Sequence, residues 1–120
     1  MKIVQGFTFE AAHRLPRTPP SHRCHRMHGH SYRVEIHVRG DVDPDTGLVI
    51  DFADISAAFQ PVWEQLDHHY LNEVNGLANP TSENLAAWIW GRLEGTLALH
   101  RIVVRETCRS GVDYMGPQTQ

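Results

Sequence analysis

The 120-residue sequence has only two cysteines, Cys24 and Cys108, and so few thiols exclude a disulfide-stabilised secreted domain. It also lacks an apolar run long enough to cross a membrane. Its N-terminus lacks the basic start and apolar centre of a signal peptide. We therefore expect one cytoplasmic domain, residues 1–120, with reduced thiols and no membrane partner.

The net charge of −3 at pH 7 is not the strongly basic balance of a nucleic-acid-binding domain, so we expect no nucleic-acid partner. Acidic residues are nevertheless missing from positions 14–33. Five of the eleven basic residues lie there: Arg14, Arg17, Arg23, Arg26 and Arg33. Such a locally positive segment favours an anionic substrate, for which phosphate is a candidate. A solvated basic loop is the alternative.

Histidine, in contrast, is abundant, with nine residues in 120. Three of the nine lie with Cys24 in the short stretch 24–30. His28 and His30 lead into a predicted strand over residues 29–39, and alternation along a strand points both imidazoles to one face. Their Cα atoms would lie about 6–7 Å apart, close enough to share a metal ion. The same face continues with residues that we expect to be covered: Tyr32, Val34, Ile36 and Val38.

A single His-x-His pair is common, so a metal site needs a further ligand. The predicted first strand, residues 2–13, places His13 on the same apolar face as Phe7, Phe9 and Ala11. If the two strands pair, His13 approaches His28 and His30 across the hairpin. Three neutral imidazoles suit Zn²⁺ and leave a fourth position open, as in catalytic zinc sites. The pattern therefore predicts a zinc ion on these three histidines.

The predicted order of elements is β-β, two helices, β-β, which favours an α+β fold with both helices on one face of an antiparallel sheet. Asp54 is the predicted N-cap of a first helix ending at Leu66, with Pro61 requiring a kink or a later start. Thr81 or Ser82 caps the second helix. The remaining predicted segments are a short extended piece at 48–51 and strands at 101–108 and 112–115.

Three further features carry possible chemistry. Glu106 lies on the apolar side of its predicted strand, where it is either ion-paired with an arginine or anchors a planar N–H edge of a ligand. Asp67 precedes His68, and a carboxylate can orient an imidazole for acid–base work, although histidine at a helix C-terminus also complements the dipole. The basic, histidine-rich surroundings of Cys24 favour a reactive thiolate. Cys108 is predicted to be an inert or secondary thiol.

These residues lie in segments that resemble the 6-pyruvoyltetrahydropterin synthase family over nearly the whole chain and in the same order. The matching segments are FTFEAAHRLP at 7–16, the Cys24-x-x-x-His28-Gly29-His30 motif, LDHHYLN at 66–72, NPTSE at 79–83 and ETC at 106–108. Three residues between the cysteine and His-Gly-His resemble the branch that forms 6-carboxytetrahydropterin for queuosine biosynthesis. Pyruvoyl-forming relatives usually have a longer gap.

The resemblance implies a tunnelling fold whose sheets join into a barrel in a homo-oligomer, typically a hexamer. It also implies zinc on the three histidines and Cys24 as the catalytic thiol, with Asp67 and His68 as acid–base partners that can serve a neighbouring subunit. Glu106, Thr81 and Ser82 would bind the pterin.

The implied reaction converts 7,8-dihydroneopterin triphosphate to 6-carboxy-5,6,7,8-tetrahydropterin, acetaldehyde and triphosphate. The alternatives are the pyruvoyl-forming elimination on the same substrate, and a pterin- or zinc-binding module without turnover.

Overall fold

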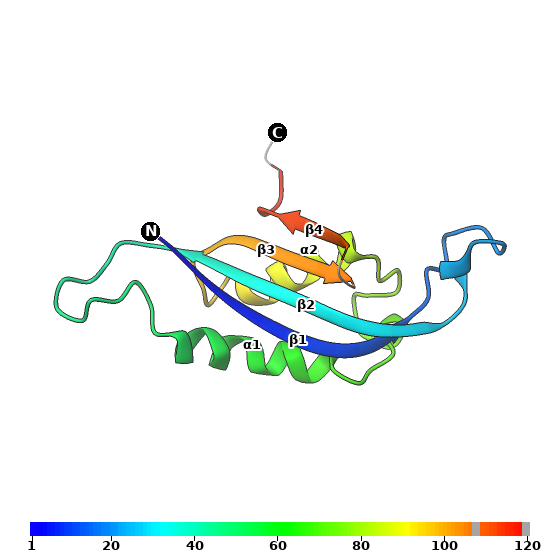
Figure 1. Ribbon diagram of the computed structural model, residues 1–120, viewed down its shortest axis with the longest axis horizontal. Helices are drawn as coiled ribbons and strands as arrows, with labels where there is room; N and C mark the ends of the chain where they lie inside the picture. The colour runs from blue at the N-terminus through cyan, green and yellow to red at the C-terminus, as the bar shows by residue number, and fades with distance from the viewer. Residues whose placement is uncertain (107–108, 119–120) are drawn as a thin grey trace.

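The computed structural model describes residues 1–106 and 109–118 and has one four-stranded antiparallel sheet in the order β1-β2-β3-β4 (Figure 1). The strands are β1 (Lys2–His13), β2 (His28–Arg39), β3 (Leu99–Glu106) and β4 (Ser110–Tyr114). Between β2 and β3 lie the helices α1 (Phe52–Leu66) and α2 (Ser82–Leu93), separated by the short 3₁₀ turn η2 (Leu71–Glu73). A further 3₁₀ turn, η1 (Arg23–His25), lies between β1 and β2. This is the predicted α+β order.

The long β1–β2 hairpin positions the histidines. Its register pairs His13 directly with His28 and Ala11 with His30. The predicted approach of His13 to the other two histidines across the hairpin is therefore confirmed. β3 continues the sheet by pairing Tyr32 with Glu106, which brings the carboxylate of the third strand to the same end of the sheet as the histidines.

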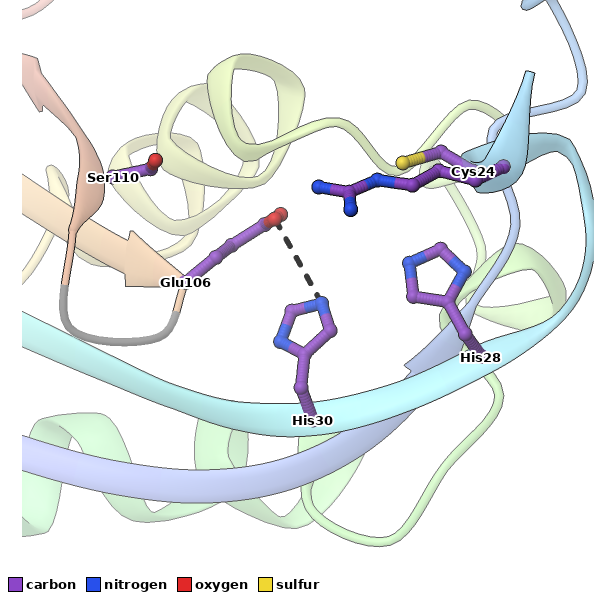
Figure 2. A pocket seen from close by; sticks show the side chains of 6 residues that line it. Cys24, His28, His30, Glu106 and Ser110 are labelled. Carbon is purple, nitrogen blue, oxygen red and sulfur yellow. Dashed lines mark ion pairs between the residues drawn. The ribbon is translucent and has the colours of Figure 1, made fainter.

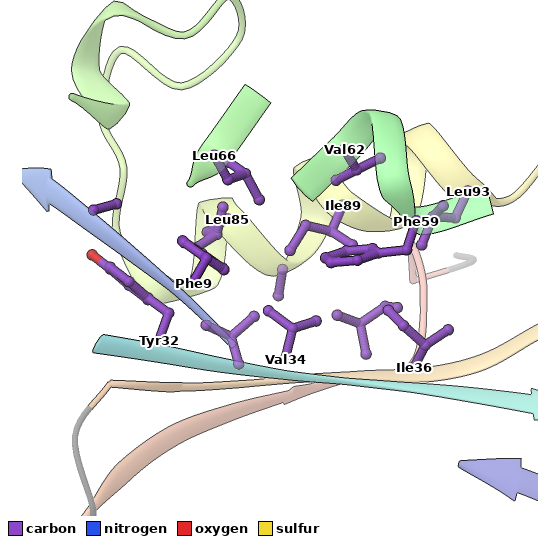
Figure 3. Close-up of a cluster of buried hydrophobic side chains, with 14 of the residues drawn as sticks. Phe9, Tyr32, Val34, Ile36, Phe59, Val62, Leu66, Leu85, Ile89 and Leu93 are labelled. Atoms are coloured by element: carbon purple, nitrogen blue, oxygen red, sulfur yellow. The ribbon is translucent and has the colours of Figure 1, made fainter. Parts of the chain in front are cut away.

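One face of the sheet and both helices enclose the hydrophobic core (Figure 3). The predicted covered face of β2 is buried, because Tyr32, Val34, Ile36 and Val38 are each at most 2% exposed. The helices contribute Phe59 and Leu66 from α1 and Leu85, Ile89 and Leu93 from α2. Burial of a side chain of this size contributes about 1.5–3 kcal/mol, so this layer fixes the sheet that carries the histidines.

The predicted start of the first helix is wrong. α1 begins at Phe52 and its N-cap is Asp51, whose carboxylate accepts a hydrogen bond of 2.9 Å from the Ala53 amide. Asp54 lies in the first turn, where its charge complements the helix dipole. Pro61 lies inside the helix, so a later start does not explain it. Residues 48–51, with a bend at 49–50, lead to the cap and contain no strand.

The second helix begins as predicted. Thr81 is its N-cap, and the Thr81 hydroxyl accepts a hydrogen bond of 3.1 Å from the Asn84 amide. β3 begins two residues earlier than the predicted 101, and β4 spans Ser110–Tyr114 where 112–115 was predicted. Thr107 and Cys108 lie outside the described residues. In the part of the chain that is described, no helix is long and apolar enough to cross a membrane.

Candidate metal and active site

The ring nitrogens of three histidines converge at the end of the hairpin. The Nε2 atom of His13 lies 3.0 Å from Nε2 of His28 and 3.2 Å from Nε2 of His30. The three rings offer one ligand atom each, all within 4.8 Å of one another. Zn–N bonds of about 2.0–2.1 Å in tetrahedral geometry place ligand nitrogens roughly 3.3 Å apart. The cluster therefore has the dimensions of a three-histidine metal site.

Backbone carbonyls decide which nitrogen of each ring carries the proton. The Nδ1 atoms of His13, His28 and His30 face the carbonyl oxygens of Pro80 (2.9 Å), Arg26 (2.8 Å) and Ser31 (3.3 Å). A carbonyl oxygen only accepts, so each Nδ1 is the donor and each neutral ring has its lone pair on Nε2.

The three Nε2 lone pairs thus point at one another with no proton between them, an arrangement that a cation at their centre satisfies. His13 is 1% exposed, and this burial lowers the pKa of its imidazole, with the charges of His28 and His30 adding to the effect. The neutral form required of a metal ligand is thereby favoured. The residues present fit a metal ion.

A hollow of about 440 Å³ opens beside the cluster (Figure 2). Cys24 faces it from the turn η1, across from His28 and His30. The Cys24 carbonyl accepts a hydrogen bond of 2.7 Å from the Leu15 amide, which ties the basic loop to the end of β1. The six lining residues are Arg23, Cys24, His28, His30, Glu106 and Ser110.

Glu106 enters this hollow from the end of β3. Its Oε1 accepts a hydrogen bond of 2.6 Å from the Ser82 hydroxyl, and its Oε2 lies 3.7 Å from Nε2 of His30. In the described residues Glu106 has no arginine ion-pair partner, so the predicted alternative of a structural arginine pair is not found. Thr81 serves as the cap of α2, which sets the position of Ser82 beside the carboxylate.

Asp67 and His68 are in contact, as acid–base partners must be. Nδ1 of His68 lies 2.7 Å from Oδ2 of Asp67, while Oδ1 accepts a hydrogen bond of 3.0 Å from the Glu10 amide. The Glu10 amide and the His68 ring lower the pKa of the Asp67 carboxyl. That carboxylate in turn raises the pKa of the His68 imidazole. Each group thus favours the charged form of the other, and the pair is held against the edge strand β1.

The pair lies away from Cys24 within one chain. Among the described residues, the lining of the Cys24 hollow includes neither Asp67 nor His68. The exposed His68 side chain lines a separate hollow beside β1 with Glu10, Gly29 and His30. The structure thus brings together His13, His28, His30, Cys24, Glu106 and Ser82, and leaves the Asp67–His68 pair apart.

Sequence reasoning named Arg23 only as one of five arginines in a positive segment, and it assigned no role to three other groups at this site. Arg23 and Ser110 line the hollow, and the Pro80 carbonyl and the Tyr32 hydroxyl meet Nδ1 of His13. Tyr32 could have been found, because it follows His28 and His30 on the same face of one strand. No side-chain pattern marks a backbone carbonyl such as that of Pro80.

Together these features define the class of the protein: an α+β enzyme with a site suited to a metal ion. The profile of the family described as 6-pyruvoyl tetrahydropterin synthase matches residues 2–117. The chain belongs to this family of pterin-processing enzymes, and the family assignment made from the sequence is confirmed.

Individual relatives support the same placement. The chain is 44% identical to the 6-carboxy-5,6,7,8-tetrahydropterin synthase of Synechocystis sp., covering 97% of this chain and 94% of the relative. It is 35% identical to the 6-pyruvoyl tetrahydrobiopterin synthase of Drosophila melanogaster, over 96% of this chain and 79% of that protein. The structure of the Caenorhabditis elegans 6-pyruvoyl tetrahydropterin synthase superposes with a TM-score of 0.88 at 26% identity, covering 98% and 96% of the two chains.

Proposed function

We propose that this protein is a zinc-dependent lyase of queuosine biosynthesis in the cytoplasm. With water, it converts 7,8-dihydroneopterin triphosphate to 6-carboxy-5,6,7,8-tetrahydropterin, acetaldehyde and triphosphate. One observation carries the proposal: three inward-facing Nε2 lone pairs lie beside a cysteine and a carboxylate in a single hollow.

Two observations support the carboxy-forming branch. Three residues separate Cys24 from His28 in the metal-ligand motif, the short spacing that resembles this branch. The Synechocystis relative with 44% identity is named for this product. The pyruvoyl-forming elimination is the second candidate, because the Drosophila relative is named for that activity.

The substrate is oriented by its two ends. The Glu106 carboxylate accepts hydrogen bonds from the amino-pyrimidine edge of the pterin, a planar pair of N–H donors that matches two carboxylate oxygens. Ser82 already donates to Glu106 and keeps that carboxylate aimed into the hollow. Thr81 supports this side by capping α2. Arg23, which also lines the hollow, offers its guanidinium to the triphosphate.

Cys24 and His68 transfer the protons. The Cys24 thiolate moves protons at the carbons of the substrate's side chain, beside the three histidines. His68, oriented by Asp67, returns protons to the same carbons. Because this pair lies outside the Cys24 hollow of its own chain, we place it in the hollow of a neighbouring subunit, within a homo-oligomer that is a hexamer.

His13, His28 and His30 would hold the zinc ion through Nε2. When bound, zinc supplies Lewis acidity toward the side-chain hydroxyls of the substrate. The Nδ1–carbonyl contacts keep the three rings aimed inward before the ion arrives.

Two variants test the roles of metal and thiol. His28→Ala removes one Nε2, so both the zinc content measured by elemental analysis and the consumption of dihydroneopterin triphosphate should be lost. Cys24→Ala leaves the ligands intact, so zinc should stay at the wild-type level while consumption of the substrate falls by at least 10²-fold. Retained zinc in His28→Ala would remove that ligand from the account, and a fully active Cys24→Ala protein would remove the thiol.

A further inference from the structure

Tyr32 is a buried tyrosine whose hydroxyl lies at the metal-facing end of the core. Its side chain is 1% exposed, and its Oη lies 3.1 Å from Nδ1 of His13. The Nδ1–H of His13 is thus shared between Tyr32 and the Pro80 carbonyl, which lies at 2.9 Å. Since Nδ1 carries the proton, the tyrosine oxygen accepts from it.

His13 is held differently from the other two histidines. The Nδ1 atoms of His28 and His30 meet the carbonyls of Arg26 and Ser31, two and one residues away in the chain. The partners of His13 come from distant parts of the fold: Tyr32 on β2 and Pro80 before α2, 19 and 67 residues away. Tertiary structure therefore sets the position of the His13 ring, whereas local backbone sets the other two.

The Tyr32 ring also contacts a second histidine. Its centroid lies 4.4 Å from the His30 ring at an interplanar angle of 35° and 5.8 Å from the His13 ring at 85°. On its other side it stacks on Phe9 at 4.8 Å and 6°, so the tyrosine is fixed by the core (Figure 3). Tyr32 thus connects the packed interior to two of the three rings.

The geometry points to Tyr32 as a positioning residue for the metal: its hydroxyl accepts from the Nδ1–H of His13 and so helps to orient that ring, and its own ring supports His30. The inference rests on the proposed metal site and adds a residue that touches neither metal nor substrate. Groups that hold the second nitrogen of a metal-bound histidine orient the ring and raise its basicity as a ligand. Removing such a partner typically weakens metal affinity by about 10–100-fold.

The test replaces only the hydroxyl. Tyr32→Phe keeps the ring and its stacking on Phe9 but leaves Nδ1 of His13 with the Pro80 carbonyl alone. Zinc affinity is measured on the full-length metal-free protein by competition with a chromophoric chelator. Tyr114→Phe is the matched control, because its ring packs against Trp90 at 5.6 Å, on the far strand β4.

We expect Tyr32→Phe to bind zinc about tenfold more weakly than wild type, and Tyr114→Phe to bind within about twofold of it. In the zinc-loaded proteins, the Nδ1 proton resonance of His13 should shift in Tyr32→Phe while that of His28 stays in place. A purely structural role would lower the melting temperature of the metal-free variant without these two changes.

The outcomes separate this inference from the proposed function. If wild type binds zinc and Tyr32→Phe binds it equally well with an unchanged His13 resonance, the positioning role is overturned and the zinc site stands. If wild type binds no zinc, the proposed metal site is overturned, and the inference with it.

Discussion

At the scale of single residues, His68 has an unusual backbone. Its φ is +58°, in the left-handed region, and it is the only non-glycine residue with positive φ in the described chain. Its amide bonds to the Glu10 carbonyl and its ring to Asp67, so the turn after α1 holds this conformation. Strain of this kind, of order 1–2 kcal/mol per residue for L side chains, persists where surrounding contacts determine it and is frequent at functional sites.

Two replacements of His68 should therefore both lose activity but differ in thermal stability. His68→Gly and His68→Ala both remove the imidazole and should both lose turnover. Glycine accepts positive φ without strain, so His68→Gly should melt about 3–6 °C higher than His68→Ala. Thermal unfolding monitored by circular dichroism measures the difference, and equal melting temperatures would show that the turn carries no strain.

The Asp67–His68 ion pair makes a prediction about pH. Asp67 raises the pKa of His68 above its usual 6.5, and Asp67→Asn should return that pKa toward this value in an NMR titration. The pKa of Asp67 is lowered from 3.8, so the pair's contribution to stability is complete between about pH 3.8 and 6.5. It is lost as pH rises through the raised pKa of His68. A His68 pKa that does not change in Asp67→Asn would contradict this coupling.

At the scale of elements, the N-terminus of α2 joins three parts of the site. The Pro80 carbonyl meets His13, the Thr81 hydroxyl caps the helix, and the Ser82 hydroxyl donates to Glu106. A single turn of backbone thus contacts both His13, a proposed metal ligand, and Glu106, the carboxylate proposed to bind the pterin. Displacing this turn should disturb both.

Two cap variants separate helix stability from site geometry. Thr81→Ala and Asp51→Ala each remove an N-cap side chain and should each lower the free energy of unfolding by about 1 kcal/mol. Only Thr81→Ala should also weaken zinc binding, because in the described residues the Asp51 cap bonds to the Ala53 amide and not to the histidine cluster. Chemical denaturation and zinc titration measure the two effects. Equal zinc affinity in both variants would show that the cap does not position Pro80.

The sequence predicts secondary-structure elements well where the alternation of apolar and polar residues is long and clear. Alternation over β1 and β2 placed His13, His28 and His30 on one face, and their convergence followed from pairing the two strands. The start of α1 was misplaced because Asp51 and Asp54 are both acceptable caps, and only the chain path chooses between them. The Pro80 carbonyl and the distance between His68 and Cys24 depend on tertiary packing, which no local pattern contains.

At the scale of the whole molecule, the sheet is open, with β1 and β4 as its edges. The face opposite the helices is charged, with ion pairs between Arg101 and Asp113 at 2.9 Å and between His37 and Glu35 at 3.1 Å. That face needs no apolar cover. The argument for an oligomer rests on the position of His68 outside the hollow that Cys24 lines.

Subunit mixing tests the shared site. Cys24→Ala and His68→Ala proteins should each be inactive alone, because each lacks one catalytic group. After unfolding and refolding together in equal amounts, random assortment should restore about a quarter of wild-type activity if each site combines two subunits. Mixtures that stay inactive, while refolded wild type is active, would place both groups in one chain.

The product of the reaction tests the central proposal most directly. Zinc-loaded protein is mixed with 7,8-dihydroneopterin triphosphate and the products are identified by mass spectrometry, with Cys24→Ala as the blank. We expect 6-carboxy-5,6,7,8-tetrahydropterin together with acetaldehyde and triphosphate. A pyruvoyl product without acetaldehyde would contradict the assignment to the carboxy-forming branch, and unconsumed substrate with zinc bound would contradict catalysis itself.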